Sequence, residues 1–187
     1  MPVTTLDPKT ALIVIDLQKG IVGYPTVHPI ADILQRAAAL AAAFRAAGQP
    51  VVLVNVTGAP PGRTDQPSPR GPFPPGFAEL VPELDQQPGD HLVTKQTRSA
   101  FTNTGLEALL RKEGVTQVVV IGVSTSAGVE STVRDAHALG FNAVVAVDAA
   151  TDMNAETHHN SVERIFPRIA ETGTTADILA LLGQRAA

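Results

Sequence analysis

Two charged side chains stand directly after segments expected to be strands, a buried apolar one before Asp16 and a short, edge-like one before Lys95. Asp16 follows residues 10–15, TALIVI, and Lys95 follows residues 91–94. The carboxyl ends of parallel strands meet at one edge of a sheet, where open α/β folds bind their ligands. A carboxylate desolvated there can act as a general acid or base, and a lysine can hold it in place or stabilise negative charge. Taken singly, each residue is more often an ordinary turn or surface residue.

The stretch between residues 115 and 135 predicts the element around which such a site would form. Residues 118–121, VVVI, are typical of a central strand, and the small residues 124–126, STS, suit a tight turn and a helix N-cap. A helix is expected over residues 127–139, whose apolar residues recur with helical spacing. Free backbone N–H groups at such a turn favour an anion or a developing oxyanion. No GxGxxG or GK[ST] motif accompanies the turn, which excludes the common dinucleotide and P-loop patterns.

Composition limits the classes of protein that the chain can represent. We expect one domain over residues 1–187, because 187 residues can bury a substantial core. The net charge of −4, without a cluster of Lys or Arg, argues against nucleic-acid and membrane partners. The opening MPVTTLDPKT lacks the regions of a signal peptide, so we expect a cytoplasmic protein. The chain contains no cysteine, which excludes a thiolate nucleophile.

Strand-like and helix-like segments alternate along most of the chain. Strands are expected at residues 10–15, 51–56, 91–94, 118–121 and 141–147. Helices are expected at 30–47, 106–114 and 127–139, after a cap at Asn154, and after residues 174–177 through residue 182. This alternation predicts a doubly wound, mostly parallel sheet with helices on both faces. The proline-rich residues 57–90 break every periodicity, and we expect them to form a lid over the site or a contact with a second subunit.

Four segments together resemble the isochorismatase-like hydrolase superfamily. They are the strand with DLQ at residues 13–18, TKQTRSAF at 94–101, GVSTSAGVESTVRDA at 122–136 and DAATDMNAETHHNSV at 148–162. The resemblance covers about residues 10–182. It implies a three-layer Rossmann-like fold with a six-stranded sheet, a cis peptide bond before Ser124, and homodimers or higher homo-oligomers.

The resemblance also implies roles for individual residues. Most members are cysteine hydrolases with an Asp–Lys–Cys triad, of which Asp16 and Lys95 match the first two, while the cysteine position is Gly128. Glycine offers no nucleophile, so hydrolysis through a thioester is not available. The resemblance extends to isochorismatases with glycine at this position, which cleave a vinyl ether by general acid catalysis. Gly128 is then expected to leave room where the cysteine sulfur lies in the relatives.

Two other functions stay open at this stage. A serine near Gly128 could replace the thiol if a base lies within hydrogen-bond reach. Alternatively, the chain could be a catalytically silent binding protein that kept the pocket.

The expected ligand is a small molecule, with neither a cofactor nor a metal ion. Residues 57–90 lack the histidines with which nicotinamidases bind a metal, and the neighbouring His158 and His159 cannot chelate together on a helix. The residues expected to contact substrate lie close to the three motifs. They are Gln18, Tyr24, Arg98, Phe101, Ser124, Thr125, Ser126, Ala127 and His158, the last of which matches a common histidine of the family.

Overall fold

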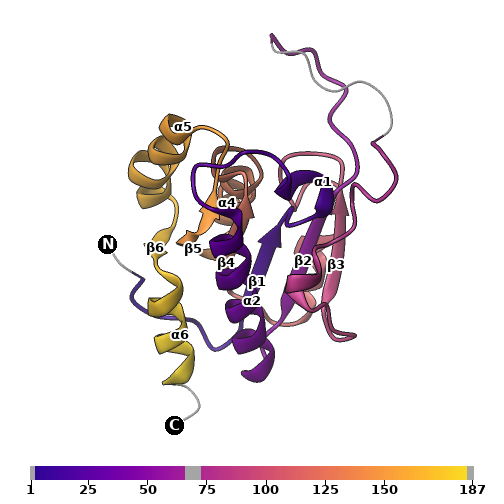
Figure 1. The fold of residues 1–187 in the computed structure, drawn as a ribbon. Coiled ribbons are helices and arrows are strands. Elements are labelled where there is room, and N and C mark those ends of the chain that lie inside the picture. Colours follow the sequence, from indigo (N-terminus) through magenta and orange to yellow (C-terminus); the bar gives the residue numbers. More distant parts are fainter. Residues whose placement is uncertain (1–2, 66–72, 185–187) are drawn as a thin grey trace.

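One sheet of six parallel strands forms the centre of the molecule, in the order β3-β2-β1-β4-β5-β6 (Figure 1). The computed structural model describes residues 3–65 and 73–184. The strands are β1 (Thr10–Ile15), β2 (Val51–Val56), β3 (His91–Lys95), β4 (Gln117–Val123), β5 (Asn142–Thr151) and β6 (Glu171–Gly173). This order confirms the predicted doubly wound, Rossmann-like α/β fold.

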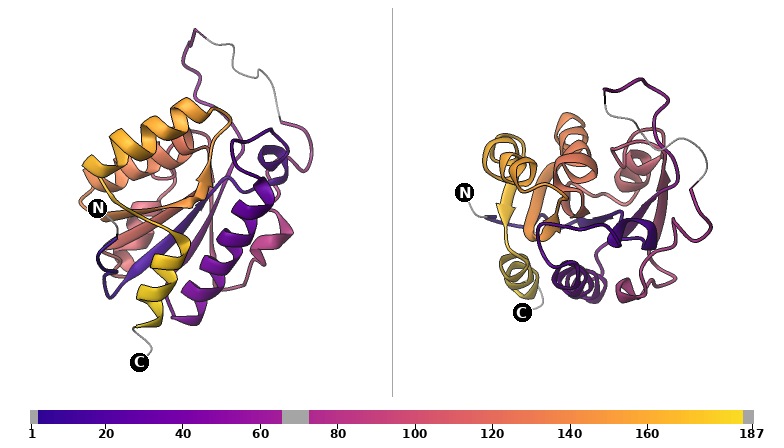
Figure 2. Two further views of the ribbon diagram at one scale, coloured as in Figure 1. Left: turned by 60° about the vertical axis from the view of Figure 1, so that its left-hand side comes forward. Right: turned by 45° about the horizontal axis from the view of Figure 1, so that its top comes forward.

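Helices cover both faces of the sheet (Figure 2). Their bounds are α1 (Lys19–Val22), α2 (Ile30–Ala46), α3 (Leu106–Lys112), α4 (Glu130–Ala138), α5 (Ala155–Asn160) and α6 (Thr175–Gly183). The views in Figure 2 place α2 and α6 on one face, and α3, α4 and α5 on the other. None of the helices in the described ranges is long and apolar enough to span a bilayer.

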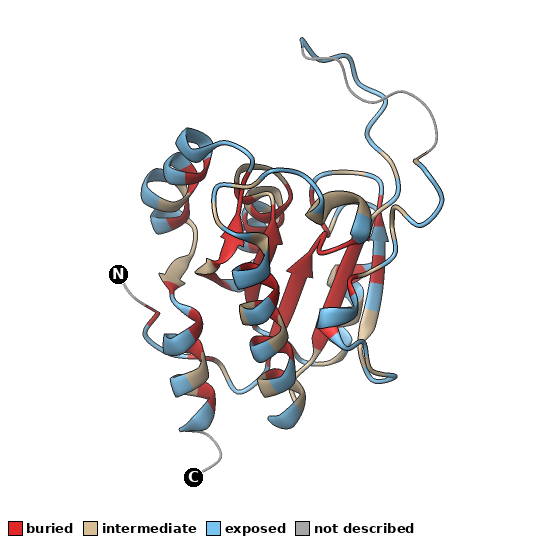
Figure 3. Cartoon of the chain, in the orientation of Figure 1, coloured by how far each residue is buried: buried red, intermediate tan, exposed pale blue. Residues whose placement is uncertain are grey.

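Alternate residues of β1 serve two separate hydrophobic clusters, one on each face of the sheet. Leu12 and Val14 belong to the cluster that includes α2 and α6, whereas Ile13 and Ile15 belong to the cluster that includes α3 and α4. Every residue of β1 is buried, and Figure 3 shows the central strands in red. Because both faces of the sheet are covered, the sequences of these strands are continuously apolar and do not alternate between apolar and polar residues.

The structure corrects the predicted elements at three places. β5 does not end at residue 147 but continues to Thr151, because its far end pairs again with β4 after a shift in register. α4 begins at Glu130, and residues 125–129 form one π-helical turn instead. Ser124 occupies the cap position of that turn without a side-chain cap bond, whereas the predicted cap Asn154 accepts bonds from two backbone N–H groups of α5.

Candidate active site

Asp16 and Lys95 meet across the sheet, although β2 separates the strands that carry them. Lys95 Nζ lies 2.7 Å from Asp16 Oδ2 and also donates to the carbonyl oxygen of Thr97 at 3.1 Å. The side chains are 2% and 9% exposed, so the ion pair is buried. Asp16 has a left-handed backbone with φ of 53°, a conformation that costs free energy in residues other than glycine and that is concentrated at functional sites.

The two carboxylate oxygens of Asp16 differ in their surroundings. Oδ2 accepts the bond from Lys95, while Oδ1 is buried and has no hydrogen-bond partner within residues 3–65 and 73–184. Burial raises the pKa of Asp16 from 3.8 to about 6, against the smaller opposing effect of the Lys95 charge. Such a group still carries a proton under mildly acidic conditions, which suits a general acid.

Gly128 packs directly against Asp16. A Cβ atom placed on Gly128 would lie 2.8 Å from Ile15 Cγ2 and 3.3 Å from Asp16 Oδ2. The expected free space beside this glycine is therefore largely taken by Ile15 and the carboxylate itself.

The turn that carries Gly128 offers fewer free N–H groups than its sequence suggested. The N–H of Ser126 donates to Asp152, and those of Ala127 and Val129 donate to the carbonyl oxygen of Ser124. These three groups are already satisfied, so they are not available to an oxyanion without rearrangement. The peptide bond between Val123 and Ser124 is cis, as the resemblance implied.

A cavity of about 410 Å³ opens beside the ion pair at the carboxyl end of the sheet. Asp16, Lys95 and Gly128 all line it. Much of its remaining wall is apolar and consists of Ile21, Tyr24, Val56, Ala59, Pro60, Phe73, Phe77, Val123, Ala127 and Met153. Two cations, Arg63 and Arg98, also face the cavity. A largely apolar pocket with a few converging polar groups is typical of small-molecule sites.

Comparison with known proteins assigns the chain to a family. Residues 10–177 match the model of the isochorismatase domain. The chain belongs to the isochorismatase family. It is 42% identical to an uncharacterized isochorismatase family protein, YecD, of Escherichia coli O157:H7, over 92% of this chain and 96% of the relative. The structure of an isochorismatase family protein from Burkholderia thailandensis is similar with a TM-score of 0.92 and 38% identity, over 96% of this chain and 98% of that one.

A more distant family relative has a named activity. Streptothricin hydrolase of Streptomyces noursei is 39% identical over 74% of this chain and 48% of the relative. The isochorismatase family therefore includes proteins named as hydrolases, and the fold and the position of the Asp16–Lys95 pair are consistent with membership.

Four of the residues predicted to contact substrate line the cavity of this isochorismatase-family chain. They are Tyr24, Arg98, Ser124 and Ala127. The other five, Gln18, Phe101, Thr125, Ser126 and His158, lie outside its lining.

Two of these five have clear structural roles. Gln18 is fully buried, accepts from the N–H of Val56, and donates to the carbonyl oxygens of Val56 and Phe77. Phe101 packs against the core and stacks on Phe141 at a ring separation of 5.9 Å. Gln18 and Phe101 therefore support the structure beneath the site and do not form part of the cavity wall.

Thr125, Ser126 and His158 form hydrogen bonds with side chains that do not line the cavity. Thr125 Oγ1 lies 2.9 Å from His158 Nδ1. Ser126 Oγ donates to Asp152 at 2.8 Å. Neither Ser126 nor Ser124, whose hydroxyl donates to the sulfur of Met153, forms a hydrogen bond with a histidine in the described structure. The geometry thus offers little support for a serine nucleophile.

Sequence reasoning missed the residues that the proline-rich segment brings to the cavity. Arg63, Phe73 and Phe77 line it, although no periodicity marks their positions. The aromatic residues gave the one available signal, since a polar loop seldom carries them without burying them.

The part of this segment that contains residues 77–79 is anchored to the start of α1. The N–H of Gly20 donates to the carbonyl oxygen of Phe77, and Lys19 pairs with Glu79 through both main chain and side chain. A Cβ on Gly20 would lie 2.0 Å from the Phe77 ring, so only glycine permits this contact. The role of residues 57–90 as a lid over the site or as a contact with a second subunit remains a prediction, and residues 66–72 lie outside the described structure.

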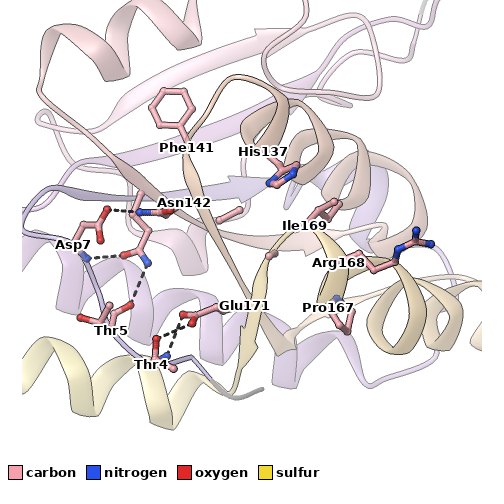
Figure 4. A pocket seen from close by; sticks show the side chains of 13 residues that line it. Thr4, Thr5, Asp7, His137, Phe141, Asn142, Pro167, Arg168, Ile169 and Glu171 are labelled. Atoms are coloured by element: carbon pink, nitrogen blue, oxygen red, sulfur yellow. Dashed lines mark hydrogen bonds between the residues drawn. The ribbon is translucent and has the colours of Figure 1, made fainter.

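A second cavity, of about 370 Å³, lies at the amino end of β4 and β5 (Figure 4). Figure 4 shows its polar side chains bonded to one another: Asn142 donates to Asp7 and Thr4 donates to Glu171. Within the described residues, none of the side-chain atoms that line this cavity is both buried and without a partner. The Asp16–Lys95 ion pair lies at the other end of the sheet.

No three His, Cys, Asp or Glu side chains in the described ranges gather closely enough to hold a metal ion. The absence of a metal from the site stays a prediction from the sequence.

Proposed function

We propose that this isochorismatase-family protein is a hydrolase that acts on a small anionic molecule without a covalent intermediate, with Asp16 as the general acid. One observation carries the proposal: Asp16 Oδ1 is buried, without a partner in the described residues, at the wall of a cavity. Its raised pKa of about 6 and the absence of a nucleophile at Gly128 support proton transfer over acyl transfer.

The reaction that fits these groups best is hydrolysis of a vinyl ether such as that of isochorismate. Asp16 protonates the methylene carbon, and the carbon attached to the ether oxygen becomes an oxocarbenium ion. Water adds to that carbon and returns a proton to the Asp16 carboxylate. The resulting hemiketal collapses to pyruvate, and its proton passes to the oxygen of the departing alcohol. Lys95 holds the carboxylate and stabilises its charge once the proton has left.

Two arginines are suited to bind carboxylate groups of such a substrate. The guanidinium groups of Arg63 and Arg98 border the cavity, and neither shows a hydrogen bond or ion pair within the parts of the chain that are described. Arginine matches the geometry of a carboxylate through two parallel hydrogen bonds. The apolar wall that includes Phe73 and Phe77 would contact the carbon skeleton.

Incubation with isochorismate and measurement of pyruvate by coupled oxidation of NADH tests the proposal. Asp16→Asn is expected to reduce kcat by about 10²–10⁴-fold, the usual contribution of a general acid. Asp85→Asn is a matched control, because Asp85 also has a left-handed backbone but lies outside the cavity. Full activity of Asp16→Asn would refute the proposed role.

The same assay separates the alternative functions. Tight binding of isochorismate by calorimetry without pyruvate release would favour a silent binding protein. A covalent adduct on Ser124 or Ser126 after treatment with an electrophilic probe would favour a serine nucleophile instead.

A further inference from the structure

Two buried polar side chains hold the Gly128 turn from the side opposite the cavity. Asp152 and His158 are 4% and 5% exposed, and both come from the segment that follows β5. Neither lines the cavity, so neither can touch a substrate there. Their contacts nevertheless end on two consecutive residues of the turn.

Asp152 accepts hydrogen bonds from both donors of Ser126. Oδ2 accepts from the N–H of Ser126 at 2.7 Å and from its hydroxyl at 2.8 Å. Oδ1 accepts from the N–H groups of Met153 and Asn154 at 2.8 Å and 3.4 Å. One carboxylate oxygen is thus bound by the two residues that follow Asp152, and the other binds the turn. A carboxylate with several backbone N–H donors forms strong, charge-assisted hydrogen bonds.

His158 holds the preceding residue of the turn. Its Nδ1 lies 2.9 Å from the hydroxyl oxygen of Thr125, and Thr125 is fully buried. The ring of His28 stands edge-on to His158 at 4.8 Å, and His28 Nδ1 lies 3.1 Å from the hydroxyl oxygen of Thr151. Burial, followed by the influence of His28 and His159, lowers the pKa of His158, so the ring is neutral near pH 7.

The position of the turn determines how closely Asp16 is covered. Gly128 lies three residues after Thr125, and its Cβ direction points at Asp16 Oδ2. Thr132 Oγ1 donates to the carbonyl oxygen of Gly128 and accepts from the N–H of Ala100, which joins the turn to the loop that follows Lys95. A displacement of the turn would therefore let water reach the Asp16 carboxyl and would weaken the desolvation that raises its pKa.

We propose that Asp152 and His158 are positioning residues that press the Gly128 turn onto Asp16 and thereby keep its carboxyl desolvated. The inference rests on the proposed function only where it treats Asp16 as the acid. The bonds themselves and their effect on Asp16 do not depend on turnover.

The test follows the titration of Asp16 by NMR of protein labelled with ¹³C at the aspartate carboxyl carbon, with Asp16→Asn to assign the signal. Thr125→Val removes the hydroxyl from His158 without changing charge or size greatly, and Asp152→Asn removes the carboxylate from Ser126. Each is expected to lower the pKa of Asp16 by at least about half a unit, because the carboxyl becomes better hydrated. Thr125→Ser keeps the hydroxyl and should restore the wild-type titration.

Ser161→Ala is the matched control. It removes a buried hydroxyl that donates to Glu130 at 2.6 Å and to the carbonyl oxygen of Thr157, and both partners lie outside residues 125–129. Its Asp16 titration should equal that of the wild type. An unchanged Asp16 pKa in folded Thr125→Val, or an equal shift in Ser161→Ala, would overturn the inference.

Kinetics give an independent readout. With isochorismate, Thr125→Val should lower kcat while KM stays near that of the wild type, since no substrate contact is lost. If isochorismate is not hydrolysed at all, the proposed function fails, yet the Asp16 titration still decides whether these residues position the turn.

Discussion

The two ends of the sheet carry cavities of similar size that differ in how their polar groups are paired. At the amino end, about 370 Å³ is bordered by side chains such as Asp7 and Asn142, which bond to each other. At the carboxyl end, about 410 Å³ is bordered by Asp16, whose Oδ1 is without a partner in the described structure, and by Arg98, whose charge is not paired there.

The pairing of the polar atoms distinguishes the candidate active site from the other cavity better than the cavity volume does. A buried polar atom without a partner costs free energy, and such atoms persist where a ligand or a reaction uses them. At the amino end several polar groups hold the N-terminal segment against β4, β5 and β6, and no lining side chain has a buried atom without a partner in the described residues. The carboxyl end has kept some of its groups available.

After Asp16→Asn, the largest effect should come from Lys95→Met, which tests whether the ion pair distinguishes the two ends. Loss of a charged hydrogen-bond donor to the reacting group should lower kcat by about a hundredfold. The Lys95 charge lowers the pKa of Asp16, so its removal should raise that pKa above about 6.

The pH profile of kcat/KM checks the sign of this effect. A general acid acts in its protonated form, so activity should be constant at low pH and fall as the pH rises through about 6. In Lys95→Met the falling limb should move to higher pH. A profile that rises through pH 6 would show that Asp16 acts as a base and would contradict the proposed role.

A smaller effect is expected from Gly128→Ala. The added methyl would lie 2.8 Å from Ile15 Cγ2, and such overpacking typically costs about 1–3 kcal/mol of stability. Because the methyl also presses on Asp16, kcat should fall by about tenfold. Gly23→Ala is the control, since a Cβ there would meet nothing within 4 Å. Thermal unfolding and pyruvate release measure both effects, and equal behaviour of the two variants would refute the close packing.

Arg98→Gln should alter binding rather than chemistry. Loss of a carboxylate contact is expected to raise KM by about tenfold with little change in kcat, because one charged hydrogen bond is worth about 1.5–3 kcal/mol at most. Arg134→Gln removes an exposed arginine that pairs with Glu130 and should leave KM unchanged. An unaltered KM in Arg98→Gln would mean that Arg98 does not bind substrate.

Asp7→Asn should have the smallest effect on activity and so completes the comparison. Asp7 Oδ2 accepts bonds from Thr116 and Asn142 at the amino end. Its replacement should lower the free energy of unfolding by about 1 kcal/mol and leave kcat/KM unchanged. A substantial loss of activity would show that the amino end takes part in function.

The sequence was sufficient for the fold and for the meeting of Asp16 with Lys95, because both depend on local patterns. Apolar runs such as residues 10–15 and 51–56 predicted strands whose bounds the structure confirms. Asp16 and Lys95 were found because each follows such a strand, and parallel strands end at one edge.

The lining of the cavity could not be predicted in the same way. Arg63 and Phe77 reach it through a loop without periodicity. Outside the lining, no local pattern around Asp152 indicates that its carboxylate accepts a bond from Ser126. Gln18 and Thr125 were assigned to substrate because they neighbour motif residues, yet side chains on successive residues point in different directions. Such orientation depends on contacts between distant segments.

The contact between Gly20 and Phe77 has a consequence for how relatives of this protein could diverge. It ties the later part of the proline-rich segment, around Phe77, to α1, while residues 59–65 in its earlier part are exposed. Insertions or replacements in residues 59–65 can therefore accumulate over evolutionary time without displacing Asp16 at the end of β1. New ligand preferences could arise there one residue at a time, beside an inherited Asp16–Lys95 pair.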